Sequence, residues 1–503
     1  AVKADESFLD CEVMPRVLDM PRPYTEWTDH LRDTLPHFYL GGDKTALDET
    51  MDAFELLTQA GNLGSIMKFD LSESTKNLMQ IRTNEWKEQN ISNEEISEII
   101  KSLELVLALS SGYTAVVANP PYMGDKNMNP YLKQFIIREY EHGKSDLYAA
   151  FLLKCIHLLS PSGKLGTINM QSWMFGASFE RLRTDILALC IDSMLHLGAH
   201  TFDELSGEVV QNTCFVLTNS NQTSVGIYYR LLAGKNCREK ETMMLTSNSV
   251  YKNVPQENFY RIPGNLIGYW VSENILNKFD EKSISDVAQA RQGLATGDND
   301  RFLRMWNEVS IKNIGFGCND RQDAKESCHK WFPYNKGGSY RKWYGNQELV
   351  IAFDEENYNA LLQQGNHLPS RHLYFKNSIT WSALAGGSIS LRYSPKGFVF
   401  DTKGQCIFSD SEKLLKYLMG VLNSNVSKAF LTLMAPTLDF NCGVVGKFPY
   451  VEGDVDLNLI ASNIDVSRND WDAHETSWSF KTNDLVALKD EVFLSINGEK
   501  QNI

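Results

Sequence analysis

Four adjacent residues, Asn119-Pro120-Pro121-Tyr122, carry the clearest chemical signal in the sequence, because they directly follow the β-branched run Tyr113–Ala118. The run predicts a buried strand, and in an open α/β sheet ligands bind beyond the carboxyl ends of the strands. Two consecutive prolines fix φ and lack amide hydrogens, so the neighbouring carbonyls are held rigidly outward. The Asn119 side-chain oxygen and the Pro120 carbonyl would then form a pair of hydrogen-bond acceptors.

Such a pair of acceptors suits an exocyclic amine with two hydrogens, such as N6 of adenine. The lone pair of this nitrogen is delocalised into the ring, so holding both N–H bonds favours a more tetrahedral nitrogen that can attack a methyl sulfonium. Tyr122 supplies a flat face on which an extruded base could stack. A proline-stiffened turn without a catalytic role is the alternative. The preceding strand and the terminal tyrosine favour catalysis.

The elements that must position this tetrapeptide alternate between helices and strands. Helices are predicted for 146–159 and 179–189, and strands for 163–170, 193–197 and 209–217. This alternation predicts α/β architecture, with a mainly parallel, Rossmann-like sheet and helices on both faces. Upstream, 45–57 and a stretch ending at Leu109 are predicted helices, the second opening with a capping box at 92–95.

Composition excludes several classes of protein. The 503 residues are 43% apolar and 22% charged with a net charge of −14, which predicts packed domains without a uniformly basic coat. No apolar run is long enough to span a bilayer, so we expect no membrane association. The cysteine usage described next favours a reducing cytoplasm. The nine cysteines form no C-x-x-C pair, and we expect neither a disulfide framework nor a bound metal.

A region rich in aromatic residues and cations lies between Arg291 and Lys403, with 15 Lys/Arg against 11 Asp/Glu. Cations can anchor phosphates while Arg and Asn read base edges, so we predict contact with double-stranded DNA. A solvated basic face over aromatic core residues is the alternative for any single position. The predicted DNA-binding residues are Arg291, Arg301, Arg304, Lys336, Arg341, Lys342, Trp343, Arg392 and Lys396.

Longer blocks of the sequence resemble known adenine methyltransferases. The block 116–124 (VVANPPYMG) resembles motif IV of the enzymes that modify adenine N6 in DNA, and 146–152 with 163–183 resembles their motif V to VII region in fused restriction-modification proteins. The segments 293–306, 331–338, 341–346, 391–398 and 470–478 are similar to the PglX-type enzymes of BREX phage-exclusion systems. The resemblance covers most of the chain from about residue 110.

This resemblance implies a site-specific enzyme that transfers a methyl group from S-adenosylmethionine to a flipped adenine, in phage defence or restriction-modification. It implies that Asn119, Pro120, Pro121 and Tyr122 are catalytic. Other phage-defence proteins are possible partners. The implied domains are a mainly helical region at 1–110, the catalytic half of the methyltransferase at 111–262, a target-recognition domain at 263–450 and the start of a C-terminal helical region at 451–503.

Three further residues are predicted to line the base pocket. Phe202 aligns with the aromatic residue of motif VIII, although an ordinary core phenylalanine explains it equally well. The resemblance implies that Asp146 is the motif V acid, which would orient the base or the cofactor, and an N-cap for the following helix explains it equally well. Trp173 lies just past a predicted strand end, near the expected pocket.

One departure from the family pattern concerns the cofactor. These enzymes hold S-adenosylmethionine with an upstream glycine-rich loop, and the only glycine pair before Asn119 is in Leu40-Gly41-Gly42-Asp43, which lacks a preceding strand. We therefore expect an internal fragment with an incomplete cofactor site. Two alternatives stay open: a DNA- or protein-binding module without activity in this form, and a protein glutamine methyltransferase, which uses the same tetrapeptide.

Overall fold

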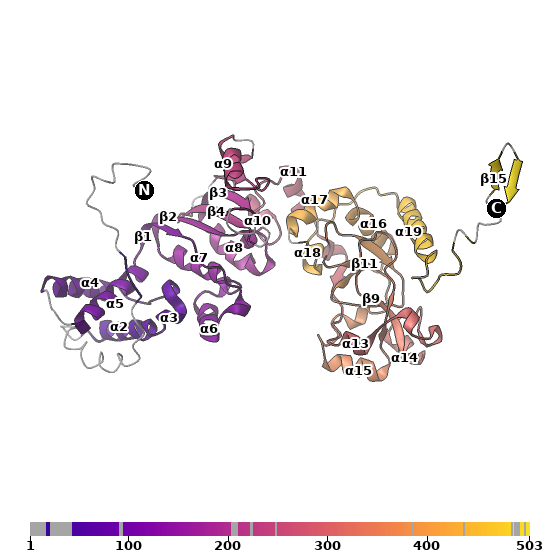
Figure 1. Cartoon of the computed structure of the whole chain (residues 1–503), viewed down its shortest axis with the longest axis horizontal. Helices are drawn as coiled ribbons and strands as arrows, with labels where there is room; N and C mark the ends of the chain where they lie inside the picture. Colours follow the sequence, from indigo (N-terminus) through magenta and orange to yellow (C-terminus); the bar gives the residue numbers. More distant parts are fainter. Residues whose placement is uncertain are drawn as a thin grey trace. The chain divides into compact units, whose positions relative to one another are not determined.

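The computed structural model describes residues 17–20, 43–89, 94–202, 210–221, 225–246, 249–384, 386–435, 438–483, 486, 493–496 and 499–502. It divides into two units, Ala1–Tyr260 and Arg261–Ile503 (Figure 1). The capping box predicted at 92–95 lies outside the residues whose side chains are described. No helix in the described ranges is long and apolar enough to cross a membrane.

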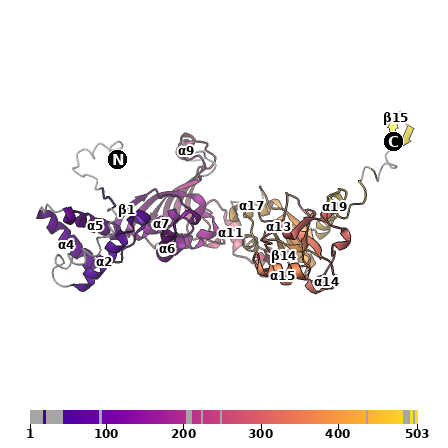
Figure 2. The same cartoon turned by 60° about the horizontal axis from the view of Figure 1, so that its bottom comes forward.

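The first unit begins with helices and continues as an α/β domain. Its helices are α2 (Lys44–Leu57), α3 (Ala60–Leu63), α4 (Glu73–Glu88), α5 (Glu94–Ser110), α6 (Pro130–Glu139), α7 (Leu147–His157), α8 (Glu180–Leu187), α9 (Cys237–Leu245) and α10 (Asn258–Arg261). Its strands are β1 (Tyr113–Ala118), β2 (Leu159–Met170), β3 (Cys190–Gly198), β4 (Asn212–Thr218), β5 (Val225–Arg230) and β6 (Val250–Pro255). Helix α9 stands clear of the helices α6 and α7 (Figure 2).

The helical region is continuous with the α/β domain because the two share one hydrophobic core. Phe54 of α2 and Leu103 of α5 are buried in the same cluster as Phe135 of α6 and Leu147 of α7. The buried ammonium of Lys154 in α7 also donates to the Leu109 carbonyl at the end of α5, at 2.6 Å. The helices before β1 therefore brace α6 and α7, the two helices that follow the tetrapeptide.

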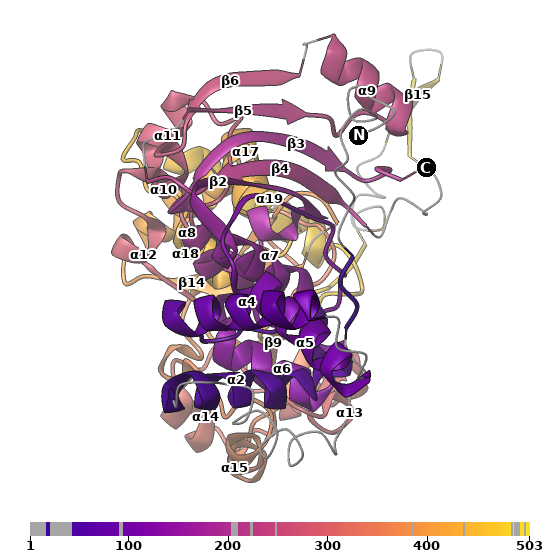
Figure 3. The same ribbon diagram turned by 90° about the vertical axis from the view of Figure 1, so that its left-hand side faces the viewer.

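The six strands form one sheet in the order β1-β2-β4-β3-β5-β6, and Figure 3 shows β2, β4, β3, β5 and β6 side by side in this order. The expected α/β class is confirmed, but the prediction of a mainly parallel sheet is wrong. Only β1–β2 and β3–β5 are parallel pairs, and the other three pairs are antiparallel. Strand β4 returns directly beside β3 as in a hairpin, which needs no helical crossover, and strand patterns alone do not set direction.

The second unit holds two four-stranded sheets, ordered β13-β9-β10-β8 and β12-β11-β14-β7. The strands are β7 (Gln289–Arg291), β8 (Leu303–Met305), β9 (Trp331–Asn335), β10 (Leu349–Ala352), β11 (Ser378–Ser382), β12 (Leu391–Ser394), β13 (Val399–Phe400) and β14 (Gly404–Phe408), followed near the end of the chain by the hairpin β15 (Phe493–Ile496) and β16 (Glu499–Asn502). The helices are α11 (Glu273–Phe279), α12 (Ile284–Val287), α13 (Asn299–Phe302), α14 (Arg321–Glu326), α15 (Glu355–Gln363), α16 (Glu412–Leu422), α17 (Asn425–Met434), α18 (Cys442–Gly446) and α19 (Leu457–Asp472).

The sheets of the second unit pack into two main hydrophobic cores, and strand β14 contributes Phe408 to one and Ile407 to the other. Phe332, Ile351 and Phe400 belong to the core of the first sheet. Trp381 and Leu391 of the second sheet pack with Leu415 of α16 and with residues of α19, including Trp471. Helix α19 is therefore part of this unit's packed body.

Candidate active site

The tetrapeptide Asn119–Tyr122 directly follows β1, which lies at the edge of the sheet. Asn119 and Pro121 are exposed, Pro120 is buried and Tyr122 is half-buried. Asn119 has no hydrogen-bond partner within the described ranges, so its amide is available to a ligand. The Asn119 side chain, one member of the predicted acceptor pair, is thus open on a proline-stiffened turn.

Four strand ends meet near this turn. Strand β1 runs parallel to β2, with Ala118 paired to Thr167, and β4 begins at Asn212, which pairs with Met170 of β2 and with Gly198 of β3. The carboxyl ends of β1, β2 and β3 and the start of β4 therefore lie at one end of the sheet. This is where an α/β sheet binds ligands.

The Tyr122 side chain is held from two sides. Its hydroxyl oxygen accepts a hydrogen bond from Nδ2 of Asn212 at 2.9 Å. Its ring meets the Tyr148 ring edge-on, with centroids 6.0 Å apart and planes at 86°. Burial, assisted by the negative charge of Asp146, raises the pKa of the Tyr122 phenol, which therefore stays protonated and neutral.

Asp146 ties the segment after the tetrapeptide to helix α7. Its Oδ1 accepts from the Tyr148 amide at 3.3 Å, as the N-cap of α7, and from the Met123 amide at 3.0 Å. The Leu147 amide in turn donates to the Met123 carbonyl at 2.9 Å. Burial raises the pKa of Asp146, against the effect of these backbone hydrogen bonds. The N-cap alternative describes what the structure shows, and the carboxylate acts as a clamp on the loop.

Trp173 does not line an open pocket, and this corrects the prediction. Its side chain is 0% exposed, its ring packs against Phe215 with centroids 4.9 Å apart, and its Nε1 donates to Thr213 at 3.1 Å. The tryptophan follows the end of β2, as expected, but its ring turns into the sheet's own core. A fully buried ring has no free face for a base.

Phe202 lies four residues after the end of β3, at the same end of the sheet as Asn212, and is 38% exposed. An exposed aromatic ring there is compatible with the predicted base contact, and its role stays a prediction.

The sequence analysis missed Asn169 and Asn212. Both side chains are 0% exposed. Asn212 lies inside the predicted strand 209–217, where it resembles an ordinary polar strand residue, and Asn169 is the only amide in its predicted strand. The sequence could point to these two asparagines only if the strand order were known, because that order places their strand ends beside the tetrapeptide.

The predicted DNA-binding residues of the second unit fall into different environments. Arg392 is 1% exposed and donates to the Arg341 carbonyl at 3.4 Å, which corrects its assignment as a DNA-binding residue. Burial lowers its pKa to about 10. Arg392 belongs to a strand whose sequence also fits an exposed surface, and only the packing against neighbouring segments buries it.

Arg341, Lys342 and Trp343 lie beside Arg392 and are engaged by the protein. Arg341 pairs with Asp470 at 2.9 Å and lies over the Trp471 ring, 5.1 Å from its centroid. Lys342 donates to the Asn423 carbonyl at 2.7 Å, and the Trp343 amide donates to the Leu391 carbonyl at 2.8 Å.

The other predicted cations lie on separate segments. Lys336 donates to Asn299 at 2.8 Å, which brings it to helix α13 and its exposed Arg301. Arg304 lies over the Trp331 ring, 5.8 Å from its centroid. Lys396 bonds to Asn319 at 3.1 Å, and Arg291 is exposed and bonds to the carbonyl of the preceding residue. The structure thus brings together only some of this predicted set.

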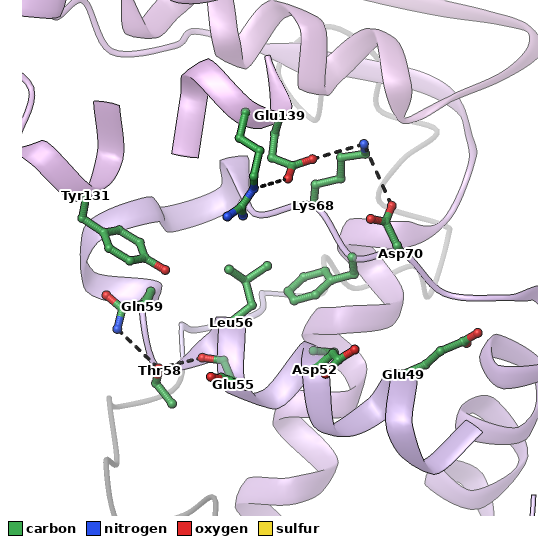
Figure 4. Close-up of a pocket in the computed structure, with 13 residues that line it drawn as sticks. Glu49, Asp52, Glu55, Leu56, Thr58, Gln59, Lys68, Asp70, Tyr131 and Glu139 are labelled. Carbon is green, nitrogen blue, oxygen red and sulfur yellow. Dashed lines mark hydrogen bonds and ion pairs between the residues drawn. The ribbon is translucent and has the colours of Figure 1, made fainter. Parts of the chain in front are cut away.

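A cavity of about 510 Å³ lies elsewhere in the first unit, between α2 and α6 (Figure 4). Lys68 pairs there with Glu139 at 3.3 Å and with Asp70 at 4.0 Å, and Glu139 also pairs with Arg138 at 2.7 Å. None of the predicted site residues lines this cavity, and its basic side chains are paired by its own acidic ones.

Comparisons with known proteins agree with the resemblance expected from the sequence. The Eco57I restriction-modification methylase family model matches residues 65–201. The chain is 39% identical over 399 residues to the adenine-specific methyltransferase PglX of Lacticaseibacillus casei (strain Zhang), a match covering 75% of this chain and 33% of that protein. It is 35% identical over 453 residues to the adenine-specific methyltransferase BrxX of Escherichia coli O9:H4 (strain HS), a match covering 88% of this chain and 37% of that protein.

The chain therefore spans about a third of the length of these curated relatives. Among solved structures, the Type IIL restriction-modification enzyme MmeI in complex with DNA is similar with a TM-score of 0.43 and 12% identity, over 91% of this chain and 72% of that one. By its sequence matches, the chain is similar to the adenine-specific methyltransferases PglX and BrxX, and its segment 65–201, which holds the Asn119–Tyr122 tetrapeptide, matches the Eco57I restriction-modification methylase model.

Proposed function

We propose that this chain forms the catalytic turn and the DNA-reading part of a site-specific DNA adenine-N6 methyltransferase. The observation that carries this proposal is the tetrapeptide at the end of β1, with the Asn119 side chain open and Tyr122 fixed by Asn212 and Tyr148. It combines two acceptors with an aromatic platform at the ligand-binding end of a sheet.

The residues of the turn would act on the adenine amine directly. The Asn119 side-chain oxygen and the Pro120 carbonyl accept the two N6 hydrogens, which localises the nitrogen lone pair for attack. Tyr122 stacks on the extruded base, and its protonated phenol keeps negative charge away from the purine. S-Adenosylmethionine, when bound, supplies the electrophilic methyl group. Pro121 keeps the turn rigid, so the acceptors need little reorganisation.

We propose that the cofactor site is incomplete in this chain. Strand β1 pairs with β2 on one side, and its other edge has no partner in the part of the chain that the structure describes. The strand is apolar, yet Val117 is 87% exposed. An unpaired apolar strand edge favours addition of another strand. A strand carrying the glycine-rich cofactor loop would fit this edge and bring the loop beside Asn119.

We propose that residues 263–450 recognise the DNA target. Support comes from the excess of cations over carboxylates between Arg291 and Lys403 and from the exposed positions of Arg291, Arg301 and Lys396. Such side chains can anchor phosphates. As the resemblance to PglX-type enzymes implies, the protein would act in the cytoplasm in phage defence, where other defence proteins are candidate partners.

The first test is a calorimetric titration of S-adenosylmethionine into the 503-residue chain. The proposal predicts no saturable binding, because the β1 edge lacks its partner strand. Saturable binding would overturn the incomplete-site proposal, and the chain itself would then serve in every catalytic assay.

The second test follows a radioactive methyl group from labelled S-adenosylmethionine, using the chain extended to the length of its relatives if the first test shows no binding. Unmethylated plasmid DNA and a protein mixture are offered together. The proposal predicts label in N6-methyladenine of DNA. Label in protein would favour the glutamine methyltransferase alternative, and absence of transfer with intact DNA binding would favour the binding module.

A further inference from the structure

Two buried asparagine amides lie behind the Tyr122 hydroxyl. Asn169 in β2 and Asn212 at the start of β4 are both 0% exposed. Nδ2 of Asn212 donates to the Tyr122 hydroxyl oxygen at 2.9 Å and contacts the Asn169 backbone carbonyl at 3.4 Å. Oδ1 of Asn169 accepts from the Thr167 hydroxyl at 3.2 Å. The sheet therefore supports Tyr122 through a polar contact on its inner side.

The neighbouring carbonyl fixes which way the Asn212 amide points. The Asn169 backbone oxygen can only accept, so the nitrogen of the Asn212 amide must face it, and the same nitrogen faces Tyr122. The Tyr122 oxygen consequently acts as an acceptor toward the sheet. Its own hydrogen is then free to point away from the sheet, and the phenol ring has one preferred position.

Two polar atoms of this pair have no partner among the residues that the structure describes. Within those ranges, Oδ1 of Asn212 and Nδ2 of Asn169 are buried without a hydrogen bond. A buried unpaired polar group costs about 1–3 kcal/mol, so such groups in a native protein call for a specific explanation. Two apolar side chains would pack this strand end more stably but would leave the Tyr122 hydroxyl unsupported.

We propose that Asn212 is a positioning residue for methyl transfer, which sets the Tyr122 ring against the extruded adenine through the hydroxyl hydrogen bond. This inference rests on the proposed function. Asn212 touches neither base nor cofactor, and it acts by restricting the ring to one position. Asn169 assists by holding the Asn212 amide in its orientation.

The experiment measures kcat and the KM for DNA of the methylating protein form, on a target found by sequencing N6-methyladenine. Tyr122→Phe removes the hydroxyl and keeps the ring, while Asn212→Ala removes its partner. Misplacing a reacting group costs large factors in rate, so each variant is expected to lower kcat about tenfold while the KM stays within about twofold. The double variant should be no slower than the slower single variant.

A matched control separates positioning from loss of stability. Asn219 follows the other end of β4, and its Nδ2 donates to the Leu159 and Ser160 carbonyls at 3.2 and 3.1 Å. Asn219→Ala removes comparable hydrogen bonds from the same sheet, far from the tetrapeptide. Its kcat should stay within about twofold of the wild-type value.

Several outcomes would overturn the inference. An unchanged kcat in Asn212→Ala would show that Asn212 does not act through Tyr122. The same conclusion would follow if Asn212→Ala lowered kcat equally in the wild type and in Tyr122→Phe. If Asn212→Ala does not fold, an unchanged kcat in Tyr122→Phe is sufficient to reject it. The proposed function fails separately, when wild-type protein leaves DNA unmethylated or Asn119→Ala retains full activity.

Discussion

The candidate residues of the two units contrast in how they are held. In the first unit, Asn119 and Tyr122 share one turn at one end of one sheet, and Asn119 is open to a ligand. In the second unit, the predicted DNA-binding cations are spread over several segments, and Arg341 and Lys342 are already engaged by Asp470 and the Asn423 carbonyl. Residues fixed to a strand end can be located from sequence, whereas the direction of a long cationic side chain depends on tertiary packing.

The largest expected effect tests how far water is excluded from the end of the first sheet that carries the tetrapeptide. Burial, with the nearby charges of Arg230 and Lys240, lowers the pKa of His196 in β3 to about 3. Between pH 3 and 6.5 the unfolded chain therefore binds more protons than the folded one, so the free energy of unfolding falls as pH falls through this window. The loss approaches about 4 kcal/mol at the acid end.

Urea unfolding between pH 7 and 4 measures this effect against His196→Gln, which keeps a donor for the Gln171 oxygen that His196 contacts at 2.8 Å. The variant should lose less stability on acidification than the wild type. Equal acid sensitivity of the two proteins would show that this end of the sheet admits water.

The second expected effect separates buried from exposed cations in the second unit. Arg392→Ala empties a core position and should lower the free energy of unfolding by about 3 kcal/mol. Arg301→Ala, at an exposed position, should cost less than about 0.5 kcal/mol. Urea denaturation compares the two, and equal losses would contradict the burial of Arg392.

The third effect concerns Asp146, which holds the segment after the tetrapeptide against helix α7. Asp146→Ala removes the N-cap of α7 and the acceptor for the Met123 amide, and should cost about 1–2 kcal/mol of stability. Asp146→Asn keeps an acceptor oxygen and should cost less. Thermal unfolding of both variants is the measurement, and an equal cost would mean that the negative charge, rather than the hydrogen bonds, holds the loop.

The smallest effect tests which cations meet DNA. Arg301→Gln should weaken duplex binding modestly. It should also make the slope of log K against log salt concentration less steep by about one. Arg341→Gln should change this slope less, because Arg341 is paired with Asp470. Fluorescence anisotropy at several salt concentrations measures both slopes. A larger effect at Arg341 would show that DNA displaces the Asp470 contact.

Much of the first unit could be predicted from local sequence. The strand Tyr113–Ala118 and the turn after it were predictable, because a β-branched run and two prolines act within a few residues. The predicted burial of this strand is wrong, since its residues are exposed or half-buried at the edge of the sheet. The direction of β4 was not predictable, because its antiparallel pairing with β3 depends on how the chain folds back after β3. The support of Tyr122 by Asn212 was also hidden, because 90 residues separate the two in sequence.

The predicted DNA-binding cations of the second unit show the same limit. Arg392 and Lys396 stand four residues apart in one predicted DNA-binding segment, yet one is buried and the other exposed. Composition gave no means of telling them apart, because burial depends on which segment covers each side chain.

The proposed role of Asn119 in DNA adenine methylation is tested most directly in the cells that carry the gene. Asn119→Ala is introduced at the native locus, and N6-methyladenine is mapped across the genome before and after. We expect that one sequence context loses its methylation completely, while chromatography and duplex binding show a folded protein of nearly unchanged DNA affinity. An unchanged methylation map would contradict it.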